Sequence, residues 1–308
     1  MRAVAVVGLM VVSALFAGCS STVHGSQMED LVTARPTGTM QGPPSSGFGT
    51  ALAVDGNLAV VGAFLEGPSR TGAVYVYRYE SGDWVLDARL ESVNPLPDGF
   101  FGSSVAVSDG RIAVGARNEG AIYVYRDAAG GWELTDRLQP SGTIASNRFG
   151  AGLVLDSSWL AFNGEVDDRE AGQRGEAVYL YAVTEGHLEL NSVIHSDPNE
   201  SASFFGGSIA LAGDTIAIGA SNHGPTSRSS GAVYLYDLST GAPVLTDELA
   251  APRGLVAHAF GASLALAGDL LAVGSPGEDY GGYRSGPVVL FGRNGGAWDA
   301  ISTLLPNT

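Results

Sequence analysis

The chain contains no lysine and a single cysteine, and only 16% of its 308 residues are charged. Its 32 acidic residues outnumber 16 basic ones, all of them arginine, which gives a formal net charge of −16. Binding to nucleic acid requires a basic surface, so we expect no nucleic-acid partner. A lone cysteine excludes a disulfide-stabilised scaffold and a cysteine zinc site.

The residues that are abundant favour β-structure. Apolar residues make up 45% of the chain and glycine contributes 44 residues. This apolar content argues against a disordered chain. Frequent valine and tyrosine, together with the missing lysine, argue against a helical bundle. The composition therefore points to an all-β protein with many turns.

The N-terminus has the pattern of an export signal. The 14-residue apolar run from Ala3 to Phe16 is shorter than the roughly 20 residues that span a bilayer. It leads into Phe16-Ala17-Gly18-Cys19, which resembles the bacterial lipoprotein signal, although leucine is more usual where Phe16 stands. This resemblance implies that residues 1–18 are removed and that Cys19 carries the lipid. The alternative is a plain secretory signal with an incidental cysteine.

A polar tether is expected after the signal. Residues 19–47 are rich in Ser, Thr, Gly and Pro, the composition of a flexible spacer. Within the tether, residues 30–36 have some strand character, and we expect them to form an edge strand.

The dipeptide Phe-Gly recurs in phase through residues 48–308. Its five copies begin at Phe48, Phe101, Phe149, Phe205 and Phe260. An alternating apolar segment follows each copy, as in Thr50–Val54, and is typical of a short strand. A two-residue Asp-Gly or Gly-Asp turn then joins it to a second strand in every repeat but the third.

The second strand ends in glycine in four repeats. The third repeat has Asn163 at this position. Asparagine is the residue that best replaces glycine at a left-handed backbone position. We therefore expect a positive φ angle at this point in every repeat.

The third and fourth strands differ in polarity. The third strand of each repeat is apolar on both faces, and in four repeats it carries two tyrosines, as in Tyr75 and Tyr77. We expect these tyrosines to pack between sheets rather than to bind a ligand. The fourth strand is half polar, which suits an outer edge.

Four antiparallel strands repeated about every 50 residues predict a β-propeller with five blades. We expect a closed ring, with residues 30–36 packed at the outer edge of the last blade. The repeats resemble the FG-GAP repeat of the integrin alpha-chain propeller in their Phe-Gly pairs and Gly-Ala strand ends. Integrin propellers have seven blades, whereas five repeats are visible in this chain.

The resemblance does not extend to calcium. Integrin-type repeats often carry a calcium loop between the first two strands, but here this connection is about two residues long. Each turn keeps one carboxylate, from Asp55, Asp109, Asp156, Asp214 or Asp269. Calcium needs about 6–8 oxygen ligands, so no calcium or other cofactor is expected.

Other acidic residues gather between the second and third strands, chiefly around Asp167/Asp168 and Glu278/Asp279. We expect solvated loops there, with weak divalent-ion binding as the alternative. None of the five histidines has metal-ligand spacing, and no nucleophile or phosphate-binding motif is present. No catalytic, cofactor-binding or metal-binding residue is predicted.

These observations predict a noncatalytic, monomeric β-propeller exported and held by lipid at the outer membrane or cell surface. Its partner would be a protein or glycan bound through variable loops such as 222–230 and 277–284. Two alternatives stay open: an exported glycosidase-type or lyase-type hydrolase, and a structural envelope protein without a specific ligand.

Overall fold

The computed structural model describes residues 40–141, 143–146, 148–168, 173–196, 204–222, 230–252, 259–276 and 286–305. Within these ranges the regular structure is entirely β-strand. No helix in the described part of the chain is long and apolar enough to cross a membrane.

The strands form five sheets in chain order. The first sheet consists of β1 (Phe48–Asp55), β2 (Leu58–Ala63), β3 (Ala73–Glu80) and β4 (Asp83–Leu90). The second consists of β5 (Phe101–Ser108), β6 (Arg111–Ala116), β7 (Ala121–Ala128) and β8 (Gly131–Leu138). The third consists of β10 (Leu153–Leu155), β11 (Trp159–Asp168), β12 (Gln173–Val183) and β13 (Leu188–His195), with the short β9 (Thr143–Ile144) paired to β11. The fourth consists of β14 (Phe205–Ala212), β15 (Thr215–Ala220), β16 (Ala232–Asp237) and β17 (Val244–Leu249). The fifth consists of β18 (Ser263–Ala267), β19 (Leu270–Gly274), β20 (Val288–Asn294) and β21 (Ala297–Leu304).

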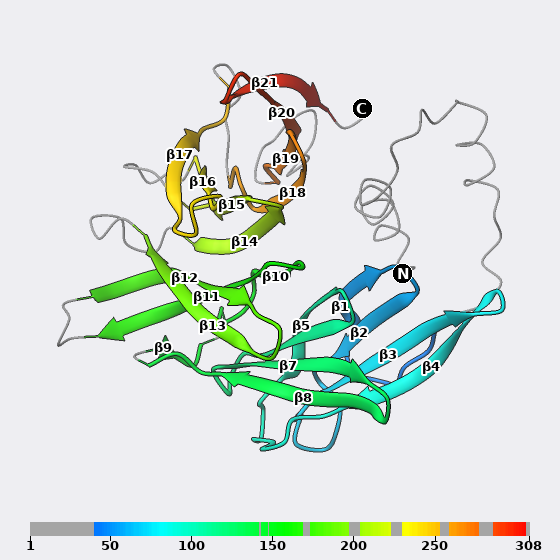
Figure 1. Cartoon of the computed structure of the whole chain (residues 1–308). Helices are drawn as coiled ribbons and strands as arrows, with labels where there is room; N and C mark the ends of the chain where they lie inside the picture. Colours follow the sequence, from blue (N-terminus) through cyan, green and yellow to red (C-terminus); the bar gives the residue numbers. More distant parts are fainter. Residues whose placement is uncertain are drawn as a thin grey trace.

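Apart from β9, which pairs with β11, each strand of a sheet pairs antiparallel with the next one along the chain. The two-residue turn Asp109-Gly110 closes the first hairpin of the second sheet, as its sequence predicts. In the first sheet Asp55 pairs with Leu58, so the turn is Gly56-Asn57 rather than the predicted Asp55-Gly56. The five sheets follow one another around a common centre (Figure 1). The prediction of an all-β, five-bladed arrangement of four-stranded antiparallel sheets is confirmed.

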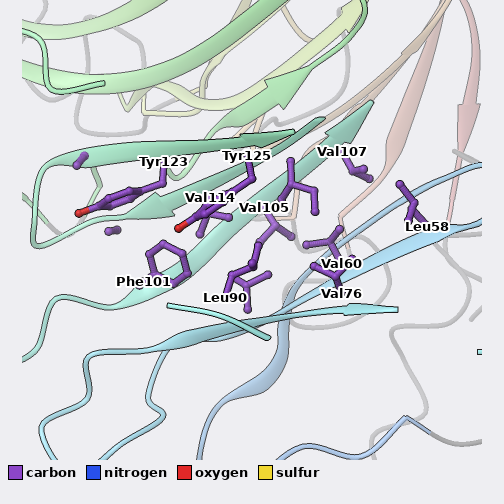
Figure 2. Close-up of a cluster of buried hydrophobic side chains, with 14 residues drawn as sticks. Leu58, Val60, Val76, Leu90, Phe101, Val105, Val107, Val114, Tyr123 and Tyr125 are labelled. Atoms are coloured by element: carbon purple, nitrogen blue, oxygen red, sulfur yellow. The ribbon is translucent and has the colours of Figure 1, made fainter. Parts of the chain in front are cut away.

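Apolar side chains from neighbouring sheets fill the space between them. Figure 2 shows Val60 and Val76 of the first sheet facing Val105, Val114 and Tyr123 of the second. Similar clusters join the second sheet to the third, the third to the fourth and the fourth to the fifth. The stacking of sheets explains why the third strand of each repeat is apolar on both faces.

The paired tyrosines belong to this packing. Tyr123 and Tyr125 are buried between the first two sheets, and the Phe101 ring meets Tyr123 edge-on with centroids 5.4 Å apart. Burial, reinforced by the charge of neighbouring Tyr179, raises the pKa of Tyr181 to about 12. The prediction that the tyrosines pack between sheets is confirmed for the pairs of the second, third and fourth sheets, whereas Tyr75 and Tyr77 are buried in a cluster of the first sheet alone.

The Phe-Gly pairs of the second and fifth sheets are hydrogen-bonded to the loop of the sheet before them, whereas the Phe149 amide of the third sheet donates to Ser146 of its own segment. Gly102 has a φ of 85°, and the register of β5 against β6 shifts between Phe101 and Ser104. The Phe101 amide donates to the Thr71 carbonyl at 2.9 Å, so the bulge lies on the loop of the preceding sheet. Phe260 repeats this bond with Ser230 at 3.1 Å.

The glycine that ends the second strand has a different role from the one predicted. Gly62 and Asn163 both lack a positive φ, so the prediction of left-handed backbone there is wrong. A Cβ atom on Gly62 would lie 2.1 Å from the Gly102 carbonyl oxygen of the next sheet. On Gly219 it would lie 2.2 Å from the Gly261 oxygen. Glycine is required because another backbone approaches closely.

The sheets form an open arc, so the prediction of a closed ring is wrong. Each sheet packs on the next, but among the described strands none of β18–β21 packs on β1–β4 as β5 packs on β1 and β2. Sheet-to-sheet geometry is fixed by the close junction contacts, and four such junctions leave the two ends apart (Figure 1).

The exposure of one apolar residue, which recurs near the end of each fourth strand, also indicates that the arc of sheets is open. The apolar residue near the end of the fourth strand is covered by the next sheet in sheets one to four, where it is 7–9% exposed. In the fifth sheet the corresponding Leu304 is 52% exposed, because no sheet follows. Residues 30–36, expected at the outer edge of the last blade, lie outside the described residues.

Replacing Gly62 by alanine should lower the free energy of unfolding by about 1–3 kcal/mol, because the new methyl group overlaps a backbone oxygen. Thermal and denaturant unfolding measure this change. Gly130→Ala is the matched control, since its Cβ would meet nothing within 4 Å and its φ is not positive. Equal losses of stability in the two variants would contradict the close-approach role of Gly62.

Candidate functional site

The junction between the third and fourth sheets is built differently from those before the second and fifth sheets. Pairing of β11 with β12 continues to Asp168 and Gln173, whereas pairing of β6 with β7 ends at Ala116 and Ala121. The third sheet therefore has a long hairpin where the first and fourth sheets have a loop that lies against the next Phe-Gly bulge. The Phe205 amide consequently needs an acceptor other than a loop carbonyl.

Glu176 supplies that acceptor. Its Oε2 accepts a hydrogen bond from the Phe205 amide at 2.8 Å, and its Oε1 pairs with Nη1 of Arg148 at 2.9 Å. Glu176 is buried, so both of its carboxylate oxygens are paired away from water. Charge-assisted hydrogen bonds of this kind are stronger than those between neutral groups. The carboxylate joins the third sheet to the start of the fourth.

Phe204 is held in a strained conformation beside this pair. Its φ is 55°, in the left-handed region that costs a residue with a Cβ roughly 1–3 kcal/mol. The Arg148 guanidinium lies 3.8 Å from the centre of the Phe204 ring, which offsets part of that cost through a cation–π contact. Phe204 is nevertheless 38% exposed.

Asn163 reorganises the backbone behind the pair. Its Oδ1 accepts from the Gly152 amide at 3.0 Å, and its Nδ2 donates to the Arg148 carbonyl at 3.0 Å. The close approach to the next sheet moves to Gly152, whose Cβ would lie 2.3 Å from the Gly206 oxygen. In other repeats glycine ends the second strand and a larger residue stands on the first strand, as Gly219 and Ser208 do. In the third repeat the sizes are exchanged, with Asn163 on the second strand and Gly152 before the first.

A cavity of about 220 Å³ opens at this junction, at the end of the sheets where the Phe-Gly pairs lie. Its walls combine one arginine, two carboxylates, an amide and two aromatic rings. The lining residues are Arg148, Ala151, Asn163, Gly164, Glu165, Glu176, Phe204, Phe205 and Gly207. This volume is below the roughly 300–1,000 Å³ of typical drug-sized ligand pockets, so it suits one sugar ring or one side chain.

The acidic residues singled out from the sequence are distributed differently from the prediction. Glu165 to Asp168 lie in strand β11 rather than in a solvated loop, and Glu165 lines the cavity. The pair Glu278/Asp279 and the lipid-attachment residue Cys19 lie outside the described residues. No group of three His, Cys, Asp or Glu side chains that could hold a metal is found within the described ranges.

Among the described residues, no three of the turn carboxylates form a group that could hold a metal. Asp55 accepts from the Asp109 amide at 3.0 Å, while Asp156 caps its own turn by accepting from the Ser158 and Trp159 amides. The variable loops expected to bind a partner are largely outside the described part of the chain: residues 223–229 and 277–285 are not described.

Sequence reasoning missed Arg148, Glu176 and Phe204. The available signal was the departure of the third repeat, where Asn163 replaces glycine and Gly152 replaces the serine or alanine of the other repeats. Such a paired departure marks a junction with changed packing. It does not reveal which side chains enter the space.

Comparison with known proteins bears on the repeats. Two parts of the chain match the FG-GAP repeat. The matched residues are 42–77 and 190–236, which fall in the first sheet and across the third and fourth sheets. The resemblance drawn from the Phe-Gly pairs is thus supported for these two segments. No curated protein sequence matches the chain significantly.

Solved structures share the fold at low sequence identity. A protein from Lactobacillus plantarum is 18% identical with a TM-score of 0.57, and the match covers 83% of this chain and 70% of that one. A putative 6-phosphogluconolactonase from Bacteroides uniformis is 12% identical with a TM-score of 0.59, and the match covers 84% and 72%. At these identities the likeness concerns the fold alone.

Glu176→Ala should lower the free energy of unfolding by about 1–3 kcal/mol, because the Phe205 amide and the Arg148 guanidinium both lose their partner. Chemical denaturation measures the loss. Glu165→Ala provides the comparison, as Glu165 faces the same cavity and is partly exposed. A loss as large in Glu165→Ala as in Glu176→Ala would show that the Glu176 contacts are not what joins the sheets.

Proposed function

We propose that this protein is a noncatalytic binding module of the bacterial cell envelope, anchored by lipid at Cys19. Its ligand is a protein or glycan, of which one side chain or sugar ring enters the cavity between the third and fourth sheets. The export signal and the lipoprotein-like Cys19 support the location. The five repeated sheets provide the rigid frame.

One observation carries the binding role: the junction between the third and fourth sheets departs from those before the second and fifth sheets, and it has a cavity lined by charged and aromatic side chains. Arg148 and Glu165 can hydrogen-bond hydroxyl or amide groups, and the exposed ring of Phe204 offers a flat apolar surface. The positive φ of Phe204 recurs at the equivalent Gly47, Phe100 and Ala259, so that conformation belongs to the repeat rather than to the cavity.

Catalysis is less well supported. Glu165 and Glu176 lie opposite each other on β11 and β12 and line one cavity, which is the feature that keeps an exported hydrolase as the second candidate. Glu176, however, is bound by Arg148 and by the Phe205 amide, so it is not free to exchange a proton with a substrate. The putative 6-phosphogluconolactonase among the similar structures is 12% identical, so its likeness concerns the fold alone.

A glycan array and a panel of envelope proteins, probed with the full chain, test the binding role. Phe204→Gly should keep the fold, because glycine adopts a positive φ freely, and should abolish binding by removing the exposed ring. Phe100→Gly is the matched control: Phe100 precedes the second Phe-Gly pair with a φ of 56° and also lies beneath an arginine, Arg117.

Binding that survives Phe100→Gly but not Phe204→Gly supports the cavity as the binding site. Binding that is retained in both variants, or lost equally in both, contradicts it. A chain that binds nothing on either panel favours the structural envelope protein. Turnover of a bound glycan that is lost in Glu165→Gln favours the hydrolase.

A further inference from the structure

An apolar patch is exposed on the face of the first sheet that no other sheet covers. It consists of Val54 on β1, Tyr79 on β3, and Trp84 and Leu86 on β4, and is called the first-sheet patch below. These side chains are 48%, 47%, 37% and 52% exposed. The Tyr79 and Trp84 rings contact each other across the hairpin, with centroids 5.2 Å apart. The β3–β4 hairpin, drawn in cyan, lies at one end of the arc (Figure 1).

The positions of Trp84 and Val54 are covered in later sheets, whereas the position of Leu86 is exposed again at Leu190 and Leu245. Trp132 of the second sheet packs on the first, and its indole N–H donates to Asp87 at 2.9 Å. Trp298 of the fifth sheet is buried against the fourth. Val107, which corresponds to Val54, is buried between sheets one and two. Trp84 and Val54 are exposed because no described sheet precedes the first one.

The N-terminal tether attaches at this same sheet. Met40, where the described chain begins, packs against the cluster that contains Phe48 and Leu52. Residues 20–39 separate Met40 from Cys19, and a chain of that length reaches at most about 70 Å. The eight residues of β3 span at most about 28 Å. A lipid on Cys19 therefore leaves the first-sheet patch within reach of the bilayer.

We propose that the first-sheet patch docks on the lipid–water interface of the membrane that holds the anchor, an inference that rests on the proposed lipid anchor. Tryptophan and tyrosine are the side chains that favour this interface, since each combines an apolar ring with a polar group. Tethering raises the local concentration of the bilayer to the millimolar range, so weak contact is sufficient.

Charge beside the patch selects the kind of lipid surface. Glu80 and Asp83 flank the aromatic pair at the hairpin turn and are both exposed. Negative head groups repel these carboxylates at short range. The patch therefore fits a neutral, zwitterionic surface better than an anionic one.

Docking through this patch orients the cavity. Tyr79 and Trp84 lie where β3 ends and β4 begins, at the opposite end of the sheets from the Phe-Gly pairs. Phe204 and the cavity lie at the Phe-Gly end. A chain docked by the first-sheet patch thus presents its cavity away from the membrane, toward a ligand.

Quenching of tryptophan fluorescence by brominated phospholipid tests the docking. The full chain, in its lipid-bearing form, is reconstituted into phosphatidylcholine vesicles with brominated acyl chains. The wild-type chain should be quenched, Trp84→Phe should lose most of the quenching, and Trp132→Phe should retain it. Leu86→Ser should weaken quenching, whereas Leu245→Ser, at the same repeat position on β17 and equally exposed at 52%, should not. Adding anionic phospholipid should reduce quenching.

The outcomes separate the anchor from the patch. A chain that is not recovered with the vesicles refutes the lipid anchor, and with it the proposed location. A chain that is recovered but shows no quenching of Trp84 overturns the docking alone. Protection of Trp84 from acrylamide quenching in the absence of lipid also contradicts the docking. If this protection disappears on dilution, a second copy of the chain covers the patch. Protection that disappears on deletion of residues 20–39 assigns the patch to the chain's own tether.

Discussion

The structure depends on the close contact that three of the Phe-Gly pairs, at Gly102, Gly206 and Gly261, make with the sheet before them. The bulge places a carbonyl oxygen where only a residue without a Cβ atom fits, as Gly102 does against Gly62. This contact fixes the separation and angle of adjacent sheets, and the buried clusters between them fill the space that it defines. The phenylalanine packs on the tyrosines of its own sheet, so one dipeptide couples packing within a sheet to packing between sheets.

The regularity of this contact explains what could be predicted. Alternating apolar residues, Asp-Gly turns and in-phase Phe-Gly pairs are local signals, and they gave the strands, their order and the burial of the tyrosines correctly. The function of Gly62 could not be read locally, because the atom that excludes a side chain belongs to a residue 40 positions later. Ring closure was missed for a related reason: it depends on angles accumulated over four junctions.

The candidate site is a local exception to the same contact. Where the loop of the preceding sheet is replaced by the long β11–β12 hairpin, a carboxylate takes the place of a backbone carbonyl, and Asn163 and Gly152 exchange roles. Sequence pattern marks the exception but not its chemistry, because Arg148, Glu176 and Phe204 come from three separate segments. The first-sheet patch lies at the opposite end of the sheets from the cavity. The proposed membrane contact and the proposed ligand site are therefore at opposite ends of the sheets.

Amide hydrogen exchange at the three Phe-Gly junctions tests most directly whether these contacts hold the sheets together. Phe101 and Phe260 donate to loop carbonyls, whereas Phe205 donates to Glu176. In Glu176→Ala, the Phe205 amide should exchange faster than in the wild type, while Phe101 and Phe260 keep their protection. Two results would contradict the claim that each of these three junctions is held by its own hydrogen bond. One is unchanged protection of the Phe205 amide from exchange, and the other is an equal loss of protection at all three amides.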